Sequence, residues 1–166
     1  MKTFFDYAGY VSTVIVFLQV LIGVGFWFWG IVPVLFRLGN GLARRKIAMF
    51  GDGESLVSLD SLLQDSKLFR RANLIKIAQP TDVDAAEDAS VFLVYWPAWK
   101  NHLEGILKRK KRSTALIVYA PQEFGFIPKE QIELLGRHRN VVVSNFRGRL
   151  LNDIVTSLIT TSYEKS

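Results

Sequence analysis

One uninterrupted apolar stretch dominates the beginning of the chain. From Tyr7 to Phe36 the sequence contains no Asp, Glu, Lys or Arg. About 20 consecutive apolar residues are enough for a helix to cross the hydrocarbon core of a bilayer. A helix of this length in a soluble core would carry a polar face, which this stretch lacks. We therefore predict a transmembrane helix within residues 1–37.

A cleaved signal peptide is the rival interpretation of the same stretch. The apolar region of a signal peptide covers about 7–15 residues and ends at small residues. Here the apolar run is longer, and bulky aromatic residues occupy its second half, namely Phe26, Trp27, Phe28 and Trp29. These features favour a helix that is retained as a membrane anchor.

After residue 45 the pattern changes to short apolar runs that alternate with amphipathic stretches. The apolar runs predict strands at Lys46–Phe50, Asn73–Ala78, Ser90–Tyr95, Thr114–Tyr119 and Asn140–Ser144. The amphipathic stretches predict helices at Ser55–Gln64, Ala98–Lys110, Pro128–Gly136 and Arg147–Ser162. The acidic segment Gln79–Ala89 has room for a single turn of helix.

Several predicted strands are nearly continuous hydrophobic runs, as in IAMF, VFLVY and ALIVY. Such runs are typical of parallel strands that are buried on both faces. The alternation of strands and helices predicts an α/β fold with a doubly wound parallel sheet. Right-handed crossovers favour the flavodoxin-like strand order 2-1-3-4-5 for five strands. The predicted organisation is an anchor at 1–37, a linker at 38–45 and one α/β domain at 46–166.

Charged residues on the two sides of the apolar stretch predict its orientation. Lys2 and Asp6 precede the stretch. The basic residues that follow it are Arg37, Arg44, Arg45 and Lys46. The positive-inside rule then places the α/β domain in the cytoplasm and the N-terminus outside. We therefore expect a single-pass protein of the inner (plasma) membrane, and the absence of cysteine fits a domain that needs no disulfide.

The parallel arrangement sorts the charged residues between the two ends of the predicted sheet. Segments that precede strands lie at one end, and the basic residues found there are Arg44, Arg45, Lys46, Lys67, Arg70, Arg71, Lys108, Arg109, Lys110, Lys111, Arg112, Arg137 and Arg139. The acidic residues that we place at the opposite end are Asp52, Glu54, Asp82, Asp84, Glu87, Asp88 and Glu123. Arg147 and Arg149 are exceptions to this separation.

The chain enters its first predicted strand from the membrane anchor through a short linker. We therefore expect the basic end to face an anionic inner leaflet, where each Lys or Arg contributes about 1 kcal/mol. One alternative is a solvated helix end that the helix dipole favours, and another is a site for a different anion. Nucleic acid is not an expected partner, because the basic run Lys108–Arg112 has no interleaved aromatic residues.

Open α/β sheets bind ligands at the carboxyl ends of their strands. From the segments that follow the strands, the candidate ligand-binding residues are Gly51, Asp52, Gly53, Glu54, Ser55, Trp96, Asn145 and Arg147. Gly51 and Gly53 open a strand-to-helix turn, as a phosphate-binding loop does, but Leu56 occupies the position of the third glycine of that motif. The alternative interpretation is a tight turn in which Ser55 caps the helix.

One carboxylate in the helix after the third strand is a candidate for catalysis. Glu104 lies downstream of Trp96 and Trp99, and a buried glutamate there would be an acid or a nucleophile. The alternative is a surface residue that pairs with Lys108 four positions later. No metal site and no cofactor are expected, because the chain has no cysteine and its two histidines fall at opposite ends of the predicted domain.

A resemblance to a known family rests on a few segments. They are Ser90-Val-Phe-Leu-Val-Tyr-Trp96, Trp99 with Glu104, Ala115-Leu-Ile-Val-Tyr119, and Ile127 with Pro128. These segments resemble the middle and end of a bacterial TIR-like domain, over about residues 46–162. In TIR enzymes that cleave NAD, the catalytic glutamate lies in the helix after the third strand, and Glu104 matches that place. The W-C-x-x-E spacing and its cysteine are missing, so the resemblance implies a degenerate, non-enzymatic module.

Three functional hypotheses follow from these observations. The preferred hypothesis is a membrane-anchored signalling or effector module that binds a nucleotide signal or a partner protein. The resemblance to TIR-like domains implies that the module self-associates into a homo-oligomer and that it acts in bacterial antiphage defence. The second is a structural or assembly subunit of a membrane complex, with Phe124, Phe126 and Ile127 as an apolar patch. The third is an enzyme that cleaves NAD, and it requires Glu104 to face a pocket.

Overall fold

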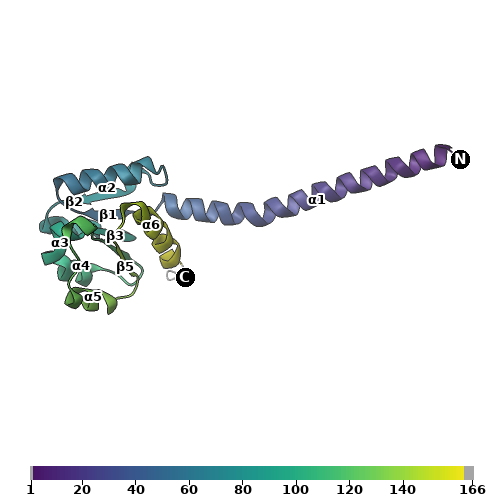
Figure 1. Cartoon of the computed structure of the whole chain (residues 1–166). Helices are drawn as coiled ribbons and strands as arrows, with labels where there is room; N and C mark the ends of the chain where they lie inside the picture. The colour runs from purple at the N-terminus through teal and green to yellow at the C-terminus, as the bar shows by residue number, and fades with distance from the viewer. Residues whose placement is uncertain (1, 163–166) are drawn as a thin grey trace. The chain divides into compact units, whose positions relative to one another are not determined.

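A computed structural model describes the backbone of residues 2–162 and the side chains of that range except residues 2–11, 35–38, 40–43 and 162. The chain divides into two compact units, Met1–Gly39 and Asn40–Ser166, and Figure 1 labels their helices and strands. The side chains of Lys2, Asp6 and Arg37, on which the predicted orientation partly rests, lie outside the described residues, as does the end of the predicted domain at 163–166.

The α/β unit is built on a five-stranded parallel sheet with the predicted order β2-β1-β3-β4-β5. Its strands are β1 (Ile47–Phe50), β2 (Leu74–Ile77), β3 (Val91–Tyr95), β4 (Ala115–Tyr119) and β5 (Val141–Ser144). Each strand lies within one residue of its predicted bounds. The central strands β1, β3 and β4 are buried almost throughout, as parallel strands are when helices cover both faces of a sheet. The predicted fold class is confirmed.

Hydrophobic layers hold helices against both faces of this sheet. On one face α2 (Gly53–Asp65) and α6 (Arg147–Ser162) contribute Leu56, Leu59, Leu63, Leu150, Ile154 and Leu158. The elements that contribute to the layer on the other face are η2 (Pro80–Ala86), α3 (Trp96–Trp99), α4 (Leu103–Arg109) and α5 (Lys129–Gly136). Each large apolar side chain that is fully buried stabilises the fold by about 1.5–3 kcal/mol. These layers therefore hold the helices in place on the two faces of the sheet.

The helix predicted over Ala98–Lys110 is divided into separate segments. α3 ends at Trp99, the short 3-10 helix η3 (Lys100–His102) follows, and α4 comes after it. The backbone leaves the helical region at Trp99, with φ −115° and ψ 8°, and at His102, with φ −109° and ψ 4°. At this break the buried Trp99 ring packs edge-to-face on Phe50 of β1, with 5.3 Å between ring centroids. Tertiary packing here overrides the helical propensity of the segment.

The long helix α1 (Lys2–Ala43) contains the predicted membrane span. Its segment Ser12–Val34 is long enough and apolar enough to cross a membrane. The helix continues to Ala43 and leaves only residues 44–46 before β1, which differs from the predicted linker at 38–45. A glycine inside a helix costs about 1 kcal/mol relative to alanine, so Gly39 and Gly41 weaken this helix without ending it.

Three carboxylates that we placed at the carboxyl end of the sheet lie at its amino end. Their ion pairs with basic residues of that end are Asp84–Arg109 at 2.8 Å, Glu87–Lys111 at 3.3 Å and Asp88–Lys46 at 4.0 Å. The reason is geometric, because the segment between β2 and β3 starts at the carboxyl end of one parallel strand and finishes at the amino end of the next. The separation of charge between the two ends is therefore less complete than the sequence predicted.

Candidate functional site

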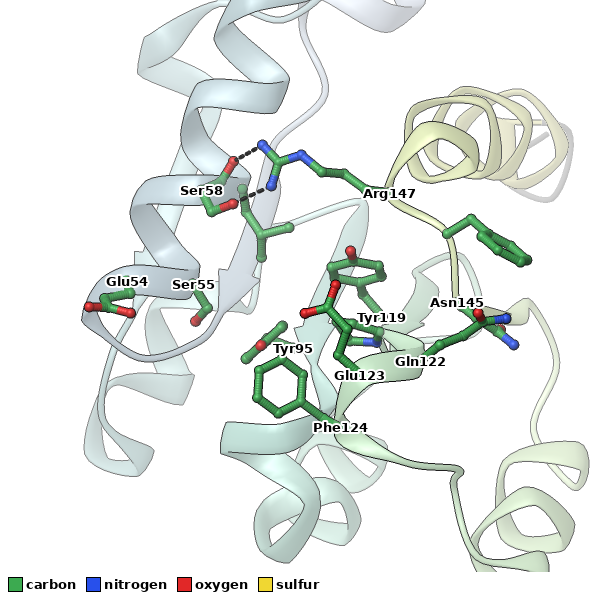
Figure 2. A pocket seen from close by; sticks show the side chains of 13 residues that line it. Glu54, Ser55, Ser58, Tyr95, Tyr119, Gln122, Glu123, Phe124, Asn145 and Arg147 are labelled. Carbon is green, nitrogen blue, oxygen red and sulfur yellow. Dashed lines mark hydrogen bonds between the residues drawn. The ribbon is translucent and has the colours of Figure 1, made fainter.

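A cavity of about 500 Å³ opens at the carboxyl ends of the strands (Figure 2). Its walls come from the first turns of α2, the ends of β3 and β4, the 3-10 helix η4 (Gln122–Phe124) and the start of α6. The lining residues are Glu54, Ser55, Ser58, Leu59, Tyr95, Tyr119, Pro121, Gln122, Glu123, Phe124, Asn145, Phe146 and Arg147. Open α/β sheets bind ligands at this position, and four of the candidate ligand-binding residues are present: Glu54, Ser55, Asn145 and Arg147.

Two tyrosines lie side by side in the cavity wall. Tyr95 and Tyr119 are partners in the register of β3 and β4, so their side chains leave the same face of the sheet. Their ring centroids are 6.0 Å apart, and Phe124 of η4 packs edge-to-face on Tyr95 at 6.2 Å. Burial raises the pKa of both phenols above the ordinary value of 10.0. Both hydroxyls therefore stay protonated at neutral pH and can donate a hydrogen bond to a ligand.

The turn after β1 caps helix α2. This is the alternative that the sequence left open to a phosphate-binding loop. The Asp52 carboxylate accepts the backbone N–H of Ser55 at 3.1 Å, and Ser55 Oγ accepts the backbone N–H of Asp52 at 2.8 Å. The side-chain hydrogen bond from Ser55 lowers the pKa of Asp52. A Cβ on Gly51 would lie 2.5 Å from Ser55 Oγ, so a larger residue at this position would displace the hydroxyl that caps the helix. Gly51, Asp52 and Gly53 form the cap and are not among the lining residues.

Arg147 joins the two helices that flank the cavity. Its guanidinium donates to the Oγ of Ser58 and, at 3.0 Å, to the Ser58 carbonyl oxygen, which connects the first residue of α6 to α2 (Figure 2). The lining also contains the carboxylates of Glu54 and Glu123. The site thus offers one guanidinium, two carboxylates, side-chain amides, neutral phenols and aromatic faces to a ligand.

Trp96 does not line this cavity, contrary to the prediction. Its side chain is 5% exposed and belongs to the core layer that α3, α4 and α5 cover. The preceding residue, Tyr95, packs with the layer on the opposite face. Tyr95 ends β3 and Trp96 begins α3, and because their side chains join opposite core layers, only Tyr95 reaches the site.

Glu104 is exposed on α4 and is not among the residues that line the cavity. Its neighbours Leu103, Ile106 and Leu107 pack on the face of the sheet opposite to α2 and α6. At this cavity, the requirement of the NAD-cleaving hypothesis is therefore not met. The cavity lining contains no histidine or cysteine to activate a nucleophile.

Sequence reasoning missed several lining residues. Tyr119 had a usable signal, because it ends β4 as Tyr95 ends β3, and parallel register brings such positions together. Ser58 lies one helical turn after Ser55 and therefore on the same side of α2. The sequence placed Glu123 at this end of the sheet, but gave no signal that Glu123 or Phe124 lines a cavity, since the shape of η4 depends on the positive φ of 87° at the glycine that ends it, Gly125.

Comparisons with known proteins add no functional assignment. No protein-family model matches the chain, and no curated protein matches it. Among the described residues, no group of three or more His, Cys, Asp and Glu side chains could hold a metal ion. The function is therefore argued from the chemistry of the cavity, because a fold alone does not specify one.

Proposed function

We propose that this chain is a membrane-anchored signalling module that binds a small nucleotide ligand at the carboxyl end of its sheet. The observation that carries this proposal is the composition of the cavity, in which aromatic faces, two carboxylates and one arginine line about 500 Å³. Small-molecule sites occupy about 300–1,000 Å³. The helix Ser12–Val34, which is long and apolar enough to span a membrane, supplies the anchor.

Each part of a nucleotide has a complementary group in the lining. Phe124 is 61% exposed and offers a face on which a base can stack, an interaction worth about 1–3 kcal/mol. The Glu123 carboxylate can accept hydrogen bonds from ribose hydroxyls, as acidic residues do in dinucleotide-binding folds. Arg147 can pair with a phosphate through charge-assisted hydrogen bonds.

The balance of charge restricts the ligand to a nucleoside or its monophosphate. Glu54 and Glu123 bring two negative charges into the lining against the single cation Arg147, which already donates two hydrogen bonds to Ser58. A diphosphate or triphosphate would bring further negative charge close to these carboxylates without an additional cation, and like charges repel. We expect the nucleoside or monophosphate to bind more tightly than the corresponding diphosphate and triphosphate.

Calorimetric titration of the full chain in detergent with a nucleoside and its mono-, di- and triphosphates tests the proposal. Phe124→Ala removes the stacking face and should weaken binding by about tenfold or more. Phe126→Ala is the matched control, because Phe126 is 88% exposed and does not line the cavity. Absence of binding across the whole series, or equal losses in the two variants, would contradict nucleotide binding at this cavity.

We propose further that the domain is TIR-like and does not cleave NAD, with antiphage defence in bacteria as the setting that the resemblance implies. The parallel strand order 2-1-3-4-5 supports the resemblance at the level of the fold. The exposed position of Glu104 outside the cavity lining supports the lack of cleavage. We expect no loss of NAD when it is incubated with the purified chain. Turnover that Glu104→Gln abolishes would overturn this part of the proposal.

A second candidate function is that of an assembly subunit, and one observation favours it. Phe124, Phe126 and Phe146 follow β4 and β5 and are exposed by 61%, 88% and 55%. A contiguous apolar surface formed by these residues would mark a protein interface, although Ile127 of the predicted patch is only 7% exposed and belongs to the core. If the chain self-associates through this surface, Phe126→Ala should reduce the particle mass measured by light scattering in detergent. A monomeric wild-type chain, with and without nucleotide, would contradict self-association.

A further inference from the structure

The end of the sheet opposite the cavity carries a row of basic residues, termed here the basic surface. The strand order places its segments next to one another along the amino ends of the strands. From one edge of the sheet to the other, the basic surface consists of Lys67, Arg70 and Arg71 before β2, Arg44, Arg45 and Lys46 before β1, residues 108–112 before β4, and Arg137 and Arg139 before β5.

The acidic segment before the central strand β3 interrupts this row, and ion pairs neutralise it from both sides. β1 and β4 flank β3. On the β1 side Asp88 lies 4.0 Å from Lys46, and on the β4 side Glu87 lies 3.3 Å from Lys111. The centre of the row is therefore close to neutral, and its positive charge is concentrated on the segments to either side.

Both outer parts of the row keep their charge. Arg70 and Arg71 at the β2 edge and Arg137 and Arg139 at the β5 edge are all exposed. Among the described residues, no carboxylate forms an ion pair within 4.0 Å with any of these four arginines, and Asp60 attracts Arg71 only from a greater distance. Together with Lys108 and Arg112 of the run before β4, they give the domain a broad positive face at one end.

We propose that the basic surface docks on the anionic lipid headgroups of the membrane that α1 crosses. Residues 35–46, of which 35–43 continue α1, separate the membrane span Ser12–Val34 from β1, so the chain from the membrane enters the domain at the same ends of the strands at which these cations gather. A tether this short holds the basic surface at a high effective concentration of headgroups. Each cation close to an anionic leaflet strengthens binding by about fivefold. This docking does not depend on nucleotide binding, and it leaves the cavity at the opposite ends of the strands open to water.

The reactivity of lysines in the full chain tests this docking. Acetylation rates are measured in nanodiscs of phosphatidylcholine alone and of an equal mixture of phosphatidylcholine and phosphatidylserine. Lys67 and Lys108 of the basic surface are exposed, as is Lys100, which lies outside it. We expect severalfold slower acetylation of Lys67 and Lys108 in the anionic discs and an unchanged rate for Lys100. Salt at about 1 M, which screens charges beyond about 3 Å, should remove the difference.

Charge reversal at both edges of the row provides a matched comparison. Arg70→Glu combined with Arg139→Glu should lose the protection of Lys108, because the loss of two cations alone weakens docking by about 25-fold and the two added carboxylates repel the anionic leaflet. Lys100→Glu combined with Lys129→Glu changes the net charge equally outside the basic surface and should keep that protection. Unfolding temperatures in detergent verify that both variants fold. If one variant does not fold, the lipid and salt comparisons on the wild-type chain still test the docking.

Two results would overturn the docking proposal. The first is equal acetylation of Lys67 and Lys108 in the two kinds of disc. The second is protection of these lysines by a short duplex RNA in phosphatidylcholine discs without protection by phosphatidylserine. Lipid headgroups and RNA both offer phosphate groups to the basic surface. Protection by RNA alone would therefore identify nucleic acid as its partner.

Discussion

At the scale of single residues, the cap of α2 explains why the cavity does not resemble a phosphate-binding loop. Asp52 and Ser55 exchange hydrogen bonds at the start of the helix, and these bonds satisfy backbone N–H groups that a phosphate would otherwise approach. The polar character of the site therefore comes from side chains, chiefly Arg147 and Glu123. This agrees with a ligand that carries at most one phosphate.

Removal of the cap should destabilise the domain. We expect Asp52→Ala to lower the free energy of unfolding by about 1 kcal/mol. The hydrogen bond from Ser55 lowers the pKa of Asp52 below its ordinary value of 3.8. The stabilisation is therefore fully present above that value and is lost as the pH falls through the lower pKa of the folded protein. Thermal unfolding in detergent at neutral and acidic pH measures the difference.

Asp65→Ala at the other end of α2 is the control for this substitution. Asp65 is exposed and lies outside the cap, so we expect little change in stability at either pH. A loss from Asp52→Ala that stays the same in strong acid would show that the ionised carboxylate is not the stabilising group.

At the scale of elements, the strands and their order could be predicted because β1, β3 and β4 are buried on both faces and are apolar at nearly every position. Features that depend on tertiary contacts could not be predicted from the sequence. The break between α3 and α4 accompanies the packing of Trp99, and η4 depends on the positive φ of Gly125. The direction of the Trp96 side chain could not be predicted from strand alternation, because Trp96 begins α3 and is not part of β3.

The packing of Trp99 gives a test of the described core. Its side chain is 3% exposed and contacts Phe50. We expect Trp99→Ala to lower the free energy of unfolding by about 3–5 kcal/mol, because a large cavity replaces the ring. The exposed Phe126 is the aromatic control, and Phe126→Ala should change stability by about 0.5 kcal/mol or less. Chemical unfolding in detergent measures both, and equal effects would contradict this assignment of core and surface.

At the scale of the whole molecule, the proposed orientation has a simple test, because the chain contains no cysteine. Ser61→Cys, at an exposed position on α2, should react with a membrane-impermeant maleimide in inside-out vesicles and not in intact cells. Thr3→Cys, on the other side of the apolar stretch, should show the reverse pattern. Labelling of Ser61→Cys in intact cells would place the α/β domain outside the cytoplasm.

The parallel sheet also separates the two proposed binding surfaces. The cavity lies at the carboxyl ends of the strands, and the basic surface lies at their amino ends. A strand of five residues spans about 16 Å, so a ligand in the cavity does not compete with lipid headgroups for the same side chains. We expect nucleotide affinity to be the same in anionic and neutral nanodiscs, as measured by calorimetric titration in both. Mutual exclusion of the two ligands would contradict this separation.

Hydrogen–deuterium exchange of the full chain in nanodiscs, with and without a nucleoside monophosphate, tests the proposed nucleotide site most directly. We expect slower exchange in the segments that carry the lining, residues 53–59, 121–124 and 145–147, and no change in α4. Unchanged exchange throughout the chain would contradict nucleotide binding. Protection centred on α4 around Glu104, without protection of the cavity segments, would contradict the proposed site and favour the hypothesis of NAD cleavage.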